Sequence, residues 1–115
     1  MPSGEGRWAT EMVHDAEIIL PALGAYEAAN ILRRHELAGL VDSGSAVQAH
    51  LDLLELAIEW WPYELVARRA WELRGSLSVY DASYVALAEL SRTRLCTLDR
   101  KIKTAPGLRC EVLNP

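Results

Sequence analysis

Three carboxylates stand where apolar segments begin or end, and their positions indicate shared chemistry. Asp81 lies in the first turn of residues 78–90, a stretch that predicts a buried helix because it is apolar on nearly every face. Asp99 directly follows residues 94–98, which predict a short strand. Glu27 interrupts the apolar face of another predicted helix. Acids at element ends on one edge of an α/β sheet can converge, because ligands bind outside the carboxyl ends of such strands.

Convergent carboxylates favour a divalent cation. Without one they would repel each other, and some would take up protons. Mg²⁺ and Mn²⁺ are hard cations that take oxygen ligands and retain several waters. A cation held in this way polarises a phosphate and activates water, so the acids predict metal-assisted phosphodiester hydrolysis. Thr97 lies two residues before Asp99, on the same side of the strand, where it could bind a metal-bound water or a phosphate oxygen.

Each acid also has a purely structural interpretation. Asp81 stands at the Ser-x-x-Asp spacing from Ser78, which is that of a capping box. Asp99 is suited to cap the short helical turn that follows it. Glu27 can lie at the edge of the apolar stripe and pair with Arg34 or with solvent. These interpretations predict that the three acids lie far apart in the structure.

The remaining chain alternates between helical and strand periodicity. Helices are expected over residues 7–14, 21–35, 46–55, 62–73, 78–90 and 99–103, and strands over residues 16–20, 56–61, 94–98 and 110–113. Strands separated by helices predict βα units and a mainly parallel sheet, so the fold class is α/β with one domain over residues 1–115. Pro21 is expected in the first turn of its helix. We expect the following apolar side chains to face inward: Val47, Leu51, Leu54, Leu65, Val66, Ala70 and Leu73.

Composition sets limits on location and partners. Half of the 115 residues are hydrophobic and 24% are charged, which is typical of a globular protein. No apolar run approaches the roughly 20 residues that span a bilayer. The first seven residues are not followed by the apolar core of a signal peptide, which predicts a cytoplasmic protein without a membrane partner. Cys96 and Cys110 are expected to be reduced core residues.

Charge is distributed unevenly along the chain. The net charge is -4, yet residues 67–115 contain nine Lys and Arg against five acids, and these residues include Asp81 and Asp99. Basic residues around acids suit an enzyme that binds a metal and a polyanion, although a solvated basic face gives the same pattern. Ser83 and Tyr84 have no plausible base nearby in the sequence, and neither is expected to take part in catalysis.

Two paired segments resemble a known family. The runs YDASYVALAE at residues 80–89 and LCTLDRK at residues 95–101 resemble the C-terminal signature of PIN-domain proteins. The likeness is strongest to the VapC-type ribonuclease toxins of bacterial toxin–antitoxin pairs. YEAANILRR at residues 26–34 resembles the family helix that bears a catalytic Glu, and residues 105–112 resemble the family's tail.

The resemblance implies a three-layer α/β/α domain with four acids that bind Mg²⁺ or Mn²⁺ and cleave RNA. Glu27, Asp81 and Asp99 match three of the acids, and Asp81 would be the main metal ligand. The resemblance further implies a cognate antitoxin and a homodimer. Supporting residues would be Thr97 and Asn30, and the side chains considered for contact with RNA phosphates are Arg33, Arg34, Arg100 and Lys101.

The fourth acid is a departure from the family pattern. In the family it is an Asp at the end of the first strand, which lies centrally in the sheet. No such strand precedes the helix at residues 7–14, and Asp15 precedes a strand rather than following one. The chain is therefore expected to be N-terminally truncated relative to the family, with a slot between the strands at residues 16–20 and 94–98. Two hypotheses follow: a metal-dependent endoribonuclease toxin, or an impaired PIN-like module that retains antitoxin or dimer binding.

Overall fold

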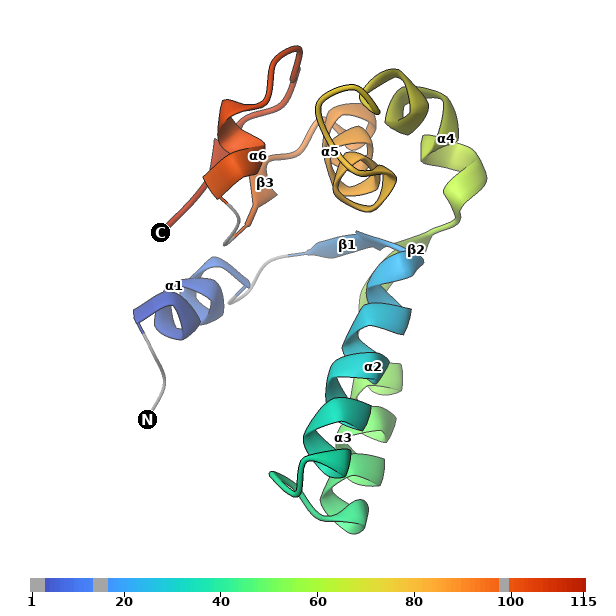
Figure 1. The fold of residues 1–115 in the computed structure, drawn as a ribbon, viewed down its shortest axis with the longest axis vertical. Coiled ribbons are helices and arrows are strands. Elements are labelled where there is room, and N and C mark those ends of the chain that lie inside the picture. Colours follow the sequence, from blue (N-terminus) through green and yellow to red (C-terminus); the bar gives the residue numbers. More distant parts are fainter. Residues whose placement is uncertain (1–3, 14–16, 98–99) are drawn as a thin grey trace.

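A computed structural model of the protein describes residues 4–13, 17–97 and 100–115 (Figure 1). The strands are β1 (Ile18–Pro21), β2 (Ile58–Trp61), β3 (Leu95–Cys96) and β4 (Val112–Leu113). The helices are α1 (Gly4–Val13), α2 (Leu23–Leu37), α3 (Ser43–Glu55), α4 (Tyr63–Glu72), α5 (Val79–Ser91) and α6 (Arg100–Thr104). Their order confirms the expected alternation of strands and helices. In the described part of the chain, no helix is long and apolar enough to cross a membrane.

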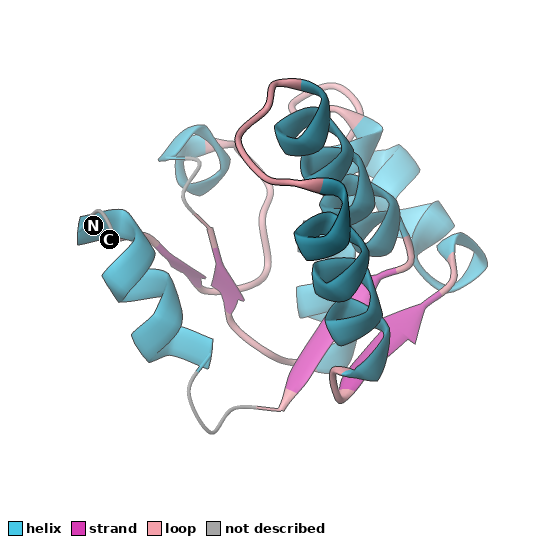
Figure 2. Cartoon of the chain, turned by 90° about the horizontal axis from the view of Figure 1, so that it is seen from below, coloured by secondary structure: helices cyan, strands magenta, loops and turns pink. Residues whose placement is uncertain are grey.

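The strands form two parallel pairs, as the α/β prediction requires. β1 pairs with β2 from Ile18 opposite Ile58 to Pro21 opposite Trp61. β3 pairs with β4, with Leu95 opposite Val112. Within the described residues no strand joins the two pairs, so β1 and β3 are not neighbours in one sheet (Figure 2).

Helix α5 supplies the centre of the hydrophobic core. Its sequence is apolar nearly all round, and the residues from Val85 to Ala88 are all buried. α4 packs along it and buries Val66 and Ala70. The C-terminal part of the chain closes the same core with Leu95, Ile102 and Val112. α5 is therefore held on several sides, which fixes the position of its first turn.

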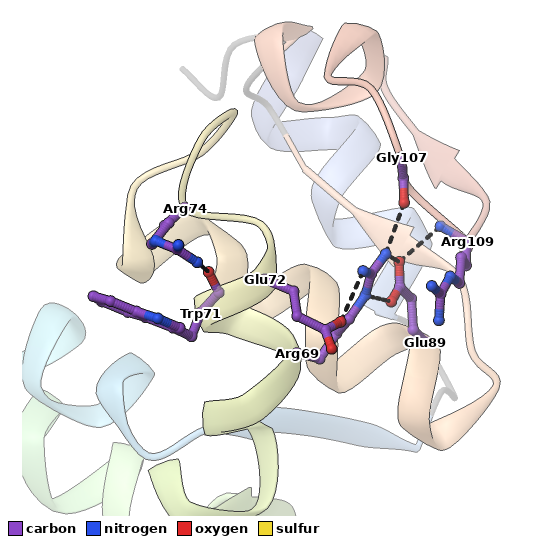
Figure 3. Close-up of polar contacts among 7 residues, drawn as sticks. All are labelled: Arg69, Trp71, Glu72, Arg74, Glu89, Gly107 and Arg109. Atoms are coloured by element: carbon purple, nitrogen blue, oxygen red, sulfur yellow. Dashed lines mark hydrogen bonds and ion pairs between the residues drawn. The ribbon is translucent and has the colours of Figure 1, made fainter.

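An ion pair between α4 and α5 reinforces this core (Figure 3). The Arg69 Nε lies 2.6 Å from Glu89 Oε1, and the two side chains are only 14% and 7% exposed. Arg69 also donates to the carbonyl oxygen of Gly107 at 2.7 Å, and the Arg109 N–H donates to Glu89 Oε2 at 2.7 Å. The pair therefore ties α4 and α5 to the segment that leads into β4.

The prediction for α3 was wrong. α2 and α3 form a helical hairpin that extends away from the other elements (Figure 1). Val47, Leu51 and Leu54 were expected to face the core, but all three are exposed. Their helical spacing is real, yet in the described structure α3 packs mainly on α2, and no further layer covers this face. Leu65 on α4 was also expected to face inward, but it is exposed.

The expected first-turn position of Pro21 was also wrong. Pro21 is the last residue of β1 and is buried, and α2 begins only at Leu23. The strand continues because the following N–H, that of Ala22, donates to the Trp61 carbonyl oxygen at 2.7 Å. A proline at a strand end does not disturb the pairing, because the missing donor falls outside the ladder.

The two cysteines differ in environment, which makes their reactivity a test of the fold. Both are free thiols, but Cys96 is exposed rather than a core residue, whereas Cys110 is half-buried. Burial raises the pKa of the Cys110 thiol, and the charge of Glu89 adds to this effect. Because the thiolate is the reactive form, we expect Cys96 to be alkylated several-fold faster than Cys110 near pH 8.

Single Cys96→Ser and Cys110→Ser variants would separate the two rates in a stopped-flow thiol assay under native conditions. Equal rates in the folded protein would contradict the described positions of β3 and of the segment before β4. Unfolding in urea is the control, because it should bring the two rates together.

Candidate metal centre

Asp81 occupies the first turn of α5, where the helix dipole favours a negative charge. Ser78 is the N-cap, and its Oγ accepts a hydrogen bond from the Asp81 N–H at 3.1 Å. The return bond of a capping box, from the Ser78 N–H to the Asp81 carboxylate, is absent from the described contacts. Ser78 therefore caps the helix with its own side chain, and the half-buried Asp81 carboxylate is not used for capping.

Glu27 reaches α5 from α2. The Tyr84 hydroxyl donates a hydrogen bond to Glu27 Oε1, and this contact joins residues 57 positions apart. Tyr84 lies three residues after Asp81, so the two share one face of α5. Glu27 is exposed to solvent, as one of the two structural interpretations expected, but its described side-chain partner is the phenol of Tyr84 rather than Arg34.

Burial and two nearby acids raise the pKa of the Tyr84 hydroxyl. Burial raises this pKa well above its ordinary value of 10, and the hydrogen bond to Glu27 adds to the effect. The negative charges of Glu27 and Asp81 raise it further, because both oppose formation of a phenolate. Tyr84 is therefore hydrogen-bonded to Glu27 and lies within the electrostatic influence of Asp81.

A glycine permits this close approach. Gly24 is buried on α2, and a Cβ atom there would lie 3.3 Å from Tyr84 Oη and 3.3 Å from Trp60 Cζ3. Gly24 and Glu27 are three residues apart, so both lie on the α2 face that meets α5. Gly24 and Tyr84 were not predicted as site residues, although each lies three residues from an acid on its own helix.

Within the described part of the chain, no hydrogen bond or ion pair links the other predicted site residues to Glu27 or Asp81. Thr97 follows β3, where its N–H donates to Leu113 at 3.0 Å and its carbonyl accepts from Asn114 at 2.9 Å. Asn30, Arg33 and Arg34 are exposed on α2. Asp99 lies outside the described residues, and Arg100 and Lys101 are described only as backbone in α6.

Glu27 and Asp81 have the chemistry that Mg²⁺ or Mn²⁺ requires. Both provide carboxylate oxygens, and these cations are commonly held by one or two carboxylates while they retain several waters. Over residues 4–13, 17–97 and 100–115, no three His, Cys, Asp or Glu side chains gather as ligands. A surface hollow near Arg69 and Glu89 includes neither acid in its lining, so the proposed metal ligands lie at a different place.

Comparisons with known proteins identify the family of the chain. A family model for the PIN domain matches residues 3–108. The chain is 33% identical over 107 residues to VapC ribonuclease Mb0985 of Mycobacterium bovis, covering 90% of this chain and 82% of the relative. It is 35% identical over 104 residues to Ribonuclease VapC1 of Mycobacterium tuberculosis, covering 89% and 74%. It is 39% identical over 84 residues to Ribonuclease VapC3 of Pyrobaculum aerophilum, covering 70% and 64%.

The chain therefore belongs to the PIN-domain family. Its likeness to the VapC-type ribonucleases, stated above for residues 80–89 and 95–101, is confirmed over most of the chain.

Proposed function

We propose that the protein is a metal-dependent endoribonuclease toxin of a toxin–antitoxin pair and acts in the cytoplasm as one domain over residues 1–115. Asp81, Glu27 and Asp99 would hold Mg²⁺ or Mn²⁺. The observation that carries the proposal is the contact through Tyr84, which brings Glu27 of α2 to the face of α5 that bears Asp81. The ribonuclease names of its relatives support the choice of RNA as the substrate.

The roles of the residues follow from their positions. The bound cation would supply positive charge to the phosphate and to the attacking water. Asp81 would orient it at the start of α5, and Glu27 would hold it from the α2 side. The Thr97 hydroxyl, near the end of β3, would bind a metal-bound water or a phosphate oxygen. The cations proposed to hold the RNA backbone are Arg33, Arg34, Arg100 and Lys101.

Incubation of the protein with single-stranded RNA and Mn²⁺ tests this proposal. We expect Mn²⁺-dependent cleavage inside the RNA, and EDTA should stop it. A second form, with an added N-terminal apolar strand that ends in Asp, should be tested beside it. The proposal for this chain fails if the protein itself does not cleave RNA in Mn²⁺, whether or not the second form does.

A second candidate function is an impaired PIN-like module that binds an antitoxin or a second copy without cleaving RNA. It is favoured by the two separate strand pairs, because no described strand lies between β1 and β3 to present a fourth acid. This alternative predicts cleavage only by the form with the added strand, together with partner binding by both forms.

The exposed apolar side chains of the α2–α3 hairpin favour binding to another protein chain. Its exposed apolar side chains include Ile31, Val47, Leu51 and Leu54. A face of this kind on a monomer marks a protein–protein interface. We propose that it serves the homodimer, and that the cognate antitoxin binds the same protein.

The dimer proposal predicts that Leu51→Asp weakens self-association by about tenfold or more, because the interface would bury an unpaired charge. The measurement is the molar mass from light scattering across a concentration series. His50→Asp is the matched control, because it places a similar carboxylate at the neighbouring exposed position of α3. An unchanged dimer in Leu51→Asp, or a wild-type protein that stays monomeric, would contradict this use of the hairpin.

A further inference from the structure

We infer that Tyr84 is a positioning residue of the metal centre, whose hydroxyl fixes one oxygen of Glu27 and leaves the second oxygen for a divalent cation. This inference rests on the proposed function, and it assigns a role to a residue outside the predicted set of ligands.

The first support is the way in which the phenol is anchored. The Tyr84 ring is half-buried and packs against the core cluster that includes Val85 and Leu87. The hydroxyl reaches across to α2, where it donates to Glu27 Oε1. The donor therefore sits on a helix whose residues from Val85 to Ala88 are all buried, and the acceptor is an exposed side chain with several rotatable bonds.

The second support is the geometry of the two helix faces. Gly24 and Glu27 lie one turn apart on α2, and Asp81 and Tyr84 lie one turn apart on α5. The hydroxyl fits between Glu27 and the bare backbone of Gly24, where a Cβ would lie 3.3 Å away. Trp60 stands at the same distance from that Cβ position, so this part of α2 has close neighbours from both β2 and α5.

The third support is the second carboxylate oxygen of Glu27, which is not the acceptor of the Tyr84 hydrogen bond. Glu27 Oε2 accepts no hydrogen bond from any side chain or N–H that the structure describes. A glutamate that must be ordered by the metal itself loses rotamer freedom when the metal binds. A carboxylate already held by a hydrogen bond has lost that freedom beforehand, and for this reason partners that orient a metal ligand increase metal affinity.

The test is the affinity for Mn²⁺ alone, measured from the electron paramagnetic resonance signal of free Mn²⁺ at constant pH. Tyr84→Phe keeps the ring and removes the donor, and we expect it to weaken binding about tenfold. Tyr80→Phe is the matched control, because Tyr80 is exposed one turn earlier on α5 and makes no described hydrogen bond through its hydroxyl. We expect it to change affinity less than about twofold.

Two further variants separate positioning from a general structural effect. Gly24→Ala keeps every site side chain but crowds the hydroxyl, so it should weaken Mn²⁺ binding in the same direction as Tyr84→Phe. In a Glu27→Ala background, Tyr84→Phe should have no additional effect, because it acts through Glu27. Circular dichroism of each variant is the check that the total helical content is unchanged.

The possible results distinguish the role of Tyr84 from the existence of the metal centre. Wild-type affinity in Tyr84→Phe, together with lost binding in Asp81→Asn, overturns the role of Tyr84 and leaves the proposed metal centre standing. An equal loss from Tyr84→Phe with and without Glu27 also overturns the positioning role. A wild-type protein that binds no Mn²⁺ overturns both.

Discussion

Replacing Asp81 with asparagine is expected to lower Mn²⁺-dependent RNA cleavage by about 100-fold or more. The substitution keeps the shape of the side chain but removes the negative charge at the start of α5. A bound cation contributes several kcal/mol to the stabilisation of developing charge, and each loss of about 1.4 kcal/mol is tenfold in rate. The measurement is the initial rate of cleavage of a fluorescent RNA in Mn²⁺.

Asp52→Asn is the matched control for this prediction. Asp52 is an exposed carboxylate on α3 that accepts a hydrogen bond from Gln48 at 2.9 Å. The same change of charge there should leave cleavage within about twofold of the wild-type rate, because Asp52 is not a proposed ligand. An Asp81→Asn protein that keeps most of its activity would show that Asp81 does not hold the metal.

Replacing Glu89 with glutamine is expected to lower the free energy of unfolding by about 3 kcal/mol, with a fall of about 10 °C in Tm. The reason is the burial of its partner: Arg69 is 14% exposed and would keep its charge without a carboxylate. Glu72→Gln is the control, because Glu72 also contacts Arg69, at 3.2 Å, but is 52% exposed. It should cost less than about 1 kcal/mol. Equal losses in the two variants would contradict a buried pair.

This ion pair also predicts a dependence on pH. Burial of Glu89 alone would raise its pKa, but hydrogen bonds from Arg69 and from the Arg109 N–H outweigh burial and lower it below its ordinary value of 4.5. A carboxylate with a lowered pKa stabilises the fold above the unfolded value, and this stabilisation is lost as pH falls through the folded value. The difference between wild type and Glu89→Gln in urea unfolding should therefore be full at pH 7 and shrink below pH 4.5. A constant difference would contradict this role of the charge.

Local patterns in the sequence predicted much of the fold. The apolar stretch around Asp81 was correctly predicted to form a buried helix, because a segment without a polar face has to be covered on every side. A strand before Pro62 was also predicted, over residues 56–61, from its alternation and the proline stop; its end at Trp61 was correct, and it begins two residues later, at Ile58. The family was recognised from two short runs, and the match over residues 3–108 confirms it.

Prediction failed where the answer depended on a distant partner. The spacing of Val47, Leu51 and Leu54 shows that one face of α3 is apolar, but periodicity does not say whether another element covers that face. Tyr84 was set aside because no base lies near it in sequence, although its acceptor Glu27 lies 57 residues away. Arg69 and Glu89 are separated by 20 residues and were missed for the same reason.

The most direct test of the central claim, that Asp81 and Glu27 share one divalent cation, is calorimetric titration of Mn²⁺ into the wild-type protein and into Asp81→Asn. The account predicts a single wild-type site that is weakened by about tenfold or more in Asp81→Asn, because one of its carboxylate ligands is gone. Equal Mn²⁺ affinity in the two proteins, or no binding by the wild type, would contradict it.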